Sequence, residues 1–210
     1  MNIIGDVAGN YKTLLALLKK MPDDLPVGLG DLNDRGPRSR EVFDFFRNTG
    51  KSILGNHEHM MLHHLLETDY YRNGNWYDAW GSHTLKSFSD VENMDTYIDW
   101  LKGLPLFIET NDLVLTHAPL AGNKESLEDC LDLGENYFAE QAFYSVIWNY
   151  YHPPKRREKY QICGHLNQLN PRFFEDKLGD FGVCVDTSPS GVLTGIHWPD
   201  KKIYQQVYID

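Results

Sequence analysis

Five short segments of this 210-residue chain hold carboxylates, an amide and imidazoles directly after apolar runs that are typical of β-strands. The segments are GDVAG (5–9), GDLNDRGP (30–37), GNHE (55–58), THAP (116–119) and CGHLN (163–167). Open α/β sheets present functional groups where their strands end, so we expect these side chains to converge along one edge. The potential metal ligands among them are Asp6, Asp31, Asn56, His117 and His165.

This mixture of ligand types suits particular metals. Carboxylate oxygens with imidazole nitrogens favour Mn, Fe or Zn over Ca, and a shared carboxylate can hold two metal ions about 3.5 to 4 Å apart. Each segment alone is weak evidence, because a Gly-Asp pair after a strand is more often a turn that caps a helix. The combination of all five predicts a dinuclear hydrolase site.

With these motifs in this order, residues 2–187 resemble the calcineurin-type metallophosphoesterases. The resemblance is greatest to the small phosphoprotein phosphatases, such as that of bacteriophage lambda, with the diadenosine tetraphosphatases close behind. It implies an α/β (α+β four-layer) fold in which helices flank a β-sandwich and form a small cap. It also implies hydrolysis by a hydroxide that bridges two divalent metal ions, with Mn expected and Fe or Zn as alternatives.

The resemblance also assigns roles to the metal ligands. It makes Asp31 the carboxylate that both metals share, and Asp6 a ligand of the first metal. The second metal would be held by Asn56, His117 and His165.

Three further residues would act on the substrate. The resemblance makes His57 the general acid, with Asp34 holding its imidazole, so that the leaving oxygen receives a proton. Arg35 would bind a phosphoryl oxygen through its planar guanidinium group.

The first motif departs from the family pattern Asp-x-His-Gly, because Ala8 stands where the family has a histidine. An alanine cannot bind a metal, so the first site is expected to be weak. Four explanations are open: an engineered substitution, a natural variant with a weak first metal, a replacement ligand such as His59, or lost catalysis. We favour a natural variant that is still active.

A second departure lies at Tyr150, where similar bacterial phosphatases often have a phosphate-binding arginine after Trp-Asn. Arg156 and Arg157 are candidates to replace it, although a solvated loop is the simpler interpretation of this charged stretch.

The hydrophobic pattern predicts how these motifs are positioned within a single domain over residues 1–210, with a helical cap at about 59–104. Helices are expected over 11–20 and 125–147, and a hairpin over 105–115. The expected strands are 2–5, 27–29, 52–54, 105–109, 113–115, 160–163, 182–185, 192–197 and 203–207.

Aromatic residues and histidines are frequent in the predicted cap. We interpret the aromatic cluster as the packed face of the cap, with a stacking wall for a nucleoside as the alternative. Its members are Tyr70, Tyr71, Trp76, Tyr77 and Trp80. The remaining histidines lack ligand spacing and are expected to have surface or packing roles; they are His63, His64, His83 and His152.

Composition excludes several classes of partner. The net charge of −10 argues against general binding of nucleic acid or of an anionic membrane. No apolar run approaches the roughly 18 residues of a membrane span, and the N-terminus lacks a signal-peptide pattern. We expect Cys130, Cys163 and Cys184 to be buried thiols in a cytoplasmic protein.

The leading hypothesis is therefore a metal-dependent phosphoesterase that hydrolyses a phosphomonoester of a serine/threonine phosphoprotein. The alternatives are a diadenosine tetraphosphatase-like hydrolase, and a phosphate-binding module with weakened catalysis. The partner is in each case a phosphorylated protein or nucleotide.

Overall fold

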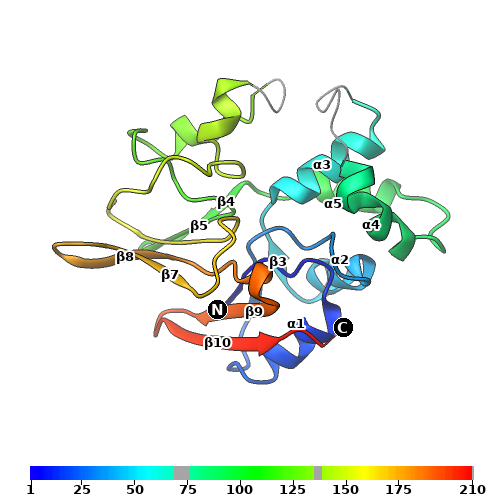
Figure 1. The fold of residues 1–210 in the computed structure, drawn as a ribbon, viewed down its shortest axis with the longest axis horizontal. Coiled ribbons are helices and arrows are strands. Elements are labelled where there is room, and N and C mark those ends of the chain that lie inside the picture. Colours follow the sequence, from blue (N-terminus) through cyan, green and yellow to red (C-terminus); the bar gives the residue numbers. More distant parts are fainter. Residues whose placement is uncertain (69–75, 135–138, 210) are drawn as a thin grey trace.

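Two five-stranded sheets form the centre of the computed structural model, which describes residues 1–68, 76–134 and 139–209 (Figure 1). The first sheet has the strand order β10-β9-β1-β2-β3. Its three short strands β1, β2 and β3 are parallel, whereas β9 and β10 are antiparallel. The strand bounds are β1 (Asn2–Ile4), β2 (Pro26–Gly28), β3 (Lys51–Ser52), β9 (Val192–His197) and β10 (Lys202–Val207).

The second sheet has the strand order β4-β5-β6-β8-β7. Its three central strands are parallel, and each edge strand pairs with them in antiparallel fashion. Ile162 pairs with Leu115 on one side and with Val183 on the other. The bounds are β4 (Phe107–Glu109), β5 (Leu113–Thr116), β6 (Tyr160–Cys163), β7 (Arg172–Asp176) and β8 (Gly179–Cys184).

Aliphatic side chains from both sheets meet in one core. Strands that are covered on both faces are expected to be apolar, as β1 after Asn2 and β5 before Thr116 are. The fully buried members include Ile3, Leu29, Leu115, Ile162, Val183 and Ile196. The predicted β-sandwich is therefore confirmed.

Helices cover the outer face of the first sheet. The predicted helix at 11–20 is α1 (Tyr11–Leu18), and α2 (Ser39–Asn48) follows β2. Figure 1 shows α3 (Asn56–Leu65), α4 (Ser82–Ser87) and α5 (Asp95–Lys102) grouped to one side of the sandwich. An apolar cluster joins the two groups: the ring of Phe43 in α2 lies 5.7 Å from that of Phe88 and 5.2 Å from that of Trp100.

The helix predicted over 125–147 is wrong. The described residues of this segment hold only two 3₁₀ helices, η3 (Glu128–Cys130) and η4 (Glu140–Tyr144). Gly134 has a left-handed φ of 74°, and Ala139 and Ser145 have extended backbones, so an α-helix is interrupted at these points. Val146 and Ile147 nevertheless pack beneath the segment in a buried apolar cluster on this side of the sandwich.

Other expectations can also be compared with the structure. The hairpin predicted over 105–115 is present as β4 and β5. Edge strand β7 was not predicted, because most of its side chains are exposed and lack an apolar alternation. The three cysteines are buried free thiols. Within the described ranges, no helix is both long enough and apolar enough to cross a membrane.

Candidate metal centre

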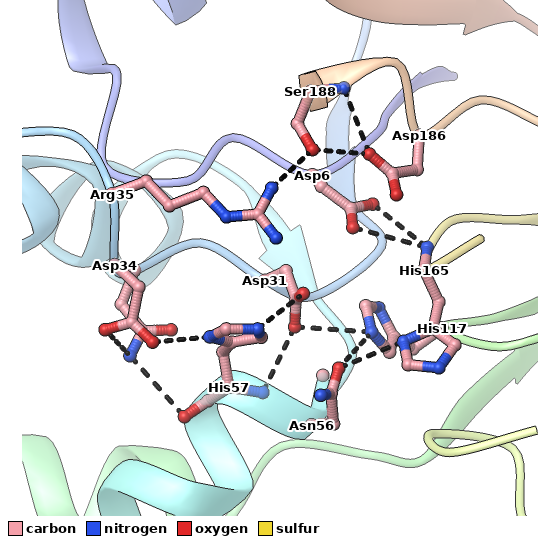
Figure 2. Close-up of polar contacts among 12 residues, drawn as sticks. Asp6, Asp31, Asp34, Arg35, Asn56, His57, His117, His165, Asp186 and Ser188 are labelled. Atoms are coloured by element: carbon pink, nitrogen blue, oxygen red, sulfur yellow. Dashed lines mark hydrogen bonds and ion pairs between the residues drawn. The ribbon is translucent and has the colours of Figure 1, made fainter. Parts of the chain in front are cut away.

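The five predicted ligands lie together at the carboxyl ends of parallel strands (Figure 2). Asp6 follows β1, Asp31 follows β2, Asn56 follows β3, His117 follows β5 and His165 follows β6. Residues that are 159 positions apart are in contact here, because both sheets end at this edge.

The potential ligand atoms of four of these side chains lie close together. Asn56 Oδ1 lies 2.8 Å from His117 Nε2 and 3.2 Å from His165 Nδ1. Asp31 Oδ1 lies 3.3 Å from the same His117 nitrogen. Ligand atoms that each bind a metal at about 2.0 to 2.2 Å are spaced about 3 Å apart, so these distances fit a coordination shell.

His117 is oriented toward the other predicted ligands. Its Nδ1 donates to the carbonyl oxygen of Leu29 at 2.8 Å, which directs Nε2 at Asn56 and Asp31. Burial, together with the nearby His117, lowers the pKa of His165 to about 3. These four side chains could together hold a divalent cation.

Asp6 extends the group on the other side of Asp31. Asp6, Asp31 and His117 each offer one atom within 4.8 Å of the others, and all three are buried. A side chain at Gly164 would place its Cβ 2.2 Å from Asp6 Oδ1, so glycine is required for this approach. Burial and the carboxylates of Asp186 and Asp31 raise the pKa of Asp6 well above its usual range. These carboxylates together favour a bound cation.

Ala8, which stands where the family has a histidine, is fixed by its neighbours. Ala8 is buried with φ of 50°, and its N–H donates to the carbonyl of Asp31 at 2.8 Å. His59 does not replace it, because His59 Nε2 faces His63 Nε2 at 3.1 Å. The carboxylate that approaches Asp6 is instead Asp186, which follows β8 and was not predicted.

His57 and Asp34 form a buried pair beside the metal ligands. His57 Nδ1 lies 2.5 Å from Asp34 Oδ2, and His57 Nε2 lies 3.7 Å from Asp31 Oδ2. Burial alone would lower the pKa of His57, but Asp31 and Asp34 outweigh it and raise the value to about 9. Its Nε2 faces the ligand group.

Two residues of the predicted cap hold Asp34 in place. Trp76 Nε1 donates to Asp34 Oδ2 at 2.7 Å, and Thr84 Oγ1 donates to Asp34 Oδ1 at 2.5 Å. Trp76 is buried, which agrees with the packing interpretation, but Tyr77 and Trp80 are 48% and 38% exposed. Tyr70 and Tyr71 lie outside the described residues.

Arg35 is held above the site by a relay of hydrogen bonds. Its Nη1 donates to Ser188 Oγ at 2.9 Å, and Ser188 Oγ donates to Asp186 Oδ1 at 2.7 Å. Figure 2 shows the guanidinium of Arg35 turned toward the same space as Asp6 and Asp31. Since Arg35 is exposed as a residue, this cation is accessible to a ligand.

The two arginines considered as replacements for an arginine at position 150 lie elsewhere. Arg156 forms a bidentate pair with Asp176 at 2.7 and 2.8 Å. Arg157 donates to the backbone carbonyls of Ala121, Lys124 and Glu125. Neither takes the place of the arginine that the family pattern has at position 150.

Glu58 connects two of the motifs, although its sequence context indicated no role for it. Its buried carboxylate accepts backbone hydrogen bonds from Asp31 at 2.8 Å, Leu32 at 2.7 Å, Asn33 at 3.3 Å and Gly55 at 2.9 Å. Burial, with a smaller contribution from Asp31, raises the pKa of Glu58 to about 7. This side chain fixes the loop that carries Asp31 against the start of α3.

A β-sandwich with this set of ligands at its strand ends is characteristic of metallophosphoesterases. The family model described as calcineurin-like phosphoesterase matches residues 2–169, and the chain belongs to this family.

Several curated relatives are bacterial proteins named bis(5′-nucleosyl)-tetraphosphatase, symmetrical. The one from Methylobacillus flagellatus is 35% identical over 140 residues, which are 63% of this chain and 47% of the relative. The one from Pasteurella multocida is 28% identical over 166 residues, which are 71% of this chain and 55% of the relative. The chain thus spans about half the length of the curated relatives it matches.

Solved structures share the fold. A putative diadenosine tetraphosphatase has a TM-score of 0.64 at 18% identity, covering 97% of this chain and 91% of its own. A protein serine/threonine phosphatase from Saccharomyces cerevisiae has a TM-score of 0.64 at 17% identity, covering 100% and 80%.

Replacing Glu58 should destabilise the whole site. Glu58→Ala leaves four buried backbone N–H groups without their acceptor. We expect the free energy of unfolding in urea to fall by about 2 to 5 kcal/mol. The exposed Glu92 provides the control, since Glu92→Ala should change stability by less than about 0.5 kcal/mol. Equal effects of the two substitutions would contradict the role given to Glu58.

Restoring a histidine at position 8 should strengthen metal binding. We expect Ala8→His to raise the affinity of one of two Mn²⁺ sites by about tenfold or more, because it adds a direct ligand beside Asp6. Calorimetric titration of the metal-free chain with Mn²⁺ measures this, and Ala8→Phe is the control of similar size that cannot bind a metal. An identical titration for Ala8→His and Ala8→Phe would rule out a metal beside position 8.

Proposed function

We propose that this chain is a metal-dependent hydrolase that cleaves a phosphoanhydride bond of a dinucleoside polyphosphate. The observation that carries the proposal is the position of His57, whose Nδ1 contacts Asp34 and whose Nε2 lies 3.7 Å from a carboxylate oxygen of Asp31. A proton donor in this position serves bond cleavage, whereas a module that only binds phosphate does not need one.

The predicted ligands are proposed to hold two divalent cations, with Mn expected and Fe or Zn as alternatives. Asp6 and Asp31 would hold the first, and Asp31, Asn56, His117 and His165 the second. Cations bound there would lower the pKa of a water molecule and neutralise phosphoryl oxygens.

The chain's own residues would complete the reaction. His57 Nε2 would donate its proton to the leaving oxygen, and Asp34 would keep the imidazole in the required orientation. Trp76 and Thr84 support this orientation, since each donates a hydrogen bond to Asp34. Arg35 would bind phosphoryl oxygens with its guanidinium group.

The choice of a nucleotide over a phosphoprotein substrate is supported by the sequence relatives. Relatives that are 33 to 35% identical bear the name symmetrical bis(5′-nucleosyl)-tetraphosphatase. The protein phosphatases among the structural neighbours are 20% identical or less, and this similarity concerns the fold alone. We therefore favour the nucleotide over the phosphoprotein that the sequence motifs first suggested.

Substrate preference can be measured directly. With Mn²⁺ content determined, we expect kcat/KM for bis(5′-adenosyl) tetraphosphate to exceed that for a phosphoserine peptide by at least tenfold. Symmetrical cleavage would release two nucleoside diphosphates, which chromatography identifies. A preference for the peptide would return the assignment to a protein phosphatase, and no turnover of either substrate would indicate a binding module.

The role of His57 can be separated from the choice of substrate. We expect His57→Asn to lower kcat by about 10² to 10⁴ for phenyl phosphate, whose leaving group needs a proton. The loss should be smaller for p-nitrophenyl phosphate, because its leaving group is less basic. His83→Asn is the control, since His83 is exposed on α4. Equal losses for the two esters would show that His57 is not the proton donor.

A further inference from the structure

An aromatic pocket opens beside the metal centre. It has a volume of about 230 Å³ and is lined by Ala142, Phe143, Trp148, Tyr150, Tyr151 and His165. Pockets for drug-sized ligands begin at roughly 300 Å³, so this one is suited to a single ring system.

Buried hydrogen bonds hold the turn that presents the two tyrosines. Asn149 is fully buried, and its Nδ2 donates to the carbonyls of Pro119 and His152 at 2.8 Å each. Its Oδ1 accepts the N–H of His152 at 3.0 Å. Tyr150 and Tyr151 project from this turn and are 51% and 72% exposed. Two large aromatic rings are thus kept accessible on a fixed backbone, which reduces the entropy lost on binding.

His165 lies between the pocket and the other predicted metal ligands. The ring centroids of Tyr150 and Trp148 lie 5.9 and 6.4 Å from that of His165, at interplanar angles of 84° and 90°. His165 Nδ1 faces Asn56 at 3.2 Å. A ring in the pocket would lie across the His165 imidazole from Asn56, which suits a ring that a spacer joins to a phosphoryl group at the metal centre. A nucleoside has this spacer in its ribose, whereas the ring of phosphotyrosine is bonded through a single oxygen to the phosphorus.

We propose that this pocket binds a nucleobase of the substrate through ring contacts with Tyr150 and Tyr151, whose own rings meet edge to face at a centroid distance of 5.6 Å. The inference rests on the proposed function and adds the position of the base to it. Stacking of a neutral base requires no cation, which suits a chain with a net charge of −10. Tyr150 also stands where the family pattern has a phosphate-binding arginine, so a contact to phosphate is exchanged for a contact to the base.

Binding of the expected product tests the pocket without turnover. The Mn²⁺-loaded chain is titrated calorimetrically with adenosine diphosphate and with inorganic pyrophosphate, which lacks the base. We expect the double variant Tyr150→Ala, Tyr151→Ala to weaken binding of adenosine diphosphate at least tenfold more than binding of pyrophosphate. The double variant with phenylalanine at both positions keeps the rings and should retain the affinity. Phe173→Ala, on edge strand β7, is the control for loss of an exposed ring.

Unchanged affinity for adenosine diphosphate in the double alanine variant would overturn the proposal. Equal weakening of both ligands would overturn it as well, because the tyrosines would then act on phosphate. The double alanine variant could also weaken binding of a phosphotyrosine peptide more than binding of adenosine diphosphate. That result would overturn the proposal, because the pocket would then bind the phosphotyrosine ring.

Turnover separates this inference from the proposed function. The ratio of kcat/KM for bis(5′-adenosyl) tetraphosphate to that for inorganic tripolyphosphate should fall at least tenfold in the double alanine variant, and stay constant in Phe173→Ala. If the natural chain hydrolyses neither compound, the proposed function fails, and the binding titration still decides whether the pocket holds a base. A constant ratio in an active double alanine variant would contradict the base pocket and leave the proposed function intact.

Discussion

The crowding of oxygen and nitrogen lone pairs at one buried point is the constraint on which the rest of this structure depends. Asp31, Asn56 and His117 face one another at 2.8 to 3.3 Å, and the carboxylates of Asp6 and Asp186 stand nearby. Carboxylates this close together repel one another unless a cation or a proton lies among them, so the surrounding chain must hold them in place. The backbone carbonyl of Leu29 and the carboxylate of Glu58 do this from below the site.

The loops that carry these groups have an unusual backbone. Ala8, Asp31, Asp34, Arg35 and His165 all have φ between 49° and 70°, a region that residues other than glycine seldom adopt. Such conformations persist only where neighbouring structure determines them, and they concentrate at functional sites. Close packing supplies this determination here: a side chain at Gly36 would place its Cβ 2.6 Å from the carbonyl oxygen of Ala8. The two loops are thereby joined backbone to backbone.

The site residues that come directly after strands could be predicted from the sequence. Short apolar runs followed by Gly-Asp, Gly-Asn or Thr-His indicate where functional groups meet, and the predicted ligands do meet there. The contacts of Trp76 and Thr84 with Asp34, and of Ser188 with Arg35, could not be predicted in this way. They join segments 42 to 153 residues apart that carry no ligand motif, and only the packing of the cap and of the turn after β8 brings them together. The helix predicted over 125–147 is wrong because the prediction rested on a composition typical of helices, whereas Gly134 adopts a left-handed backbone that ends an α-helix.

The two departures from the family pattern fall on different parts of the site. Ala8 leaves the first predicted metal position without the family's histidine, whereas the contact between His57 and Asp34 is present. Tyr150 stands where a phosphate-binding arginine was expected, and it lines an aromatic pocket that includes the predicted ligand His165. The His57–Asp34 pair is buried and Asp34 accepts hydrogen bonds from Trp76 and Thr84, so the packing that holds the pair is intact. Both departures therefore change groups that surround this pair and leave the pair itself unaltered.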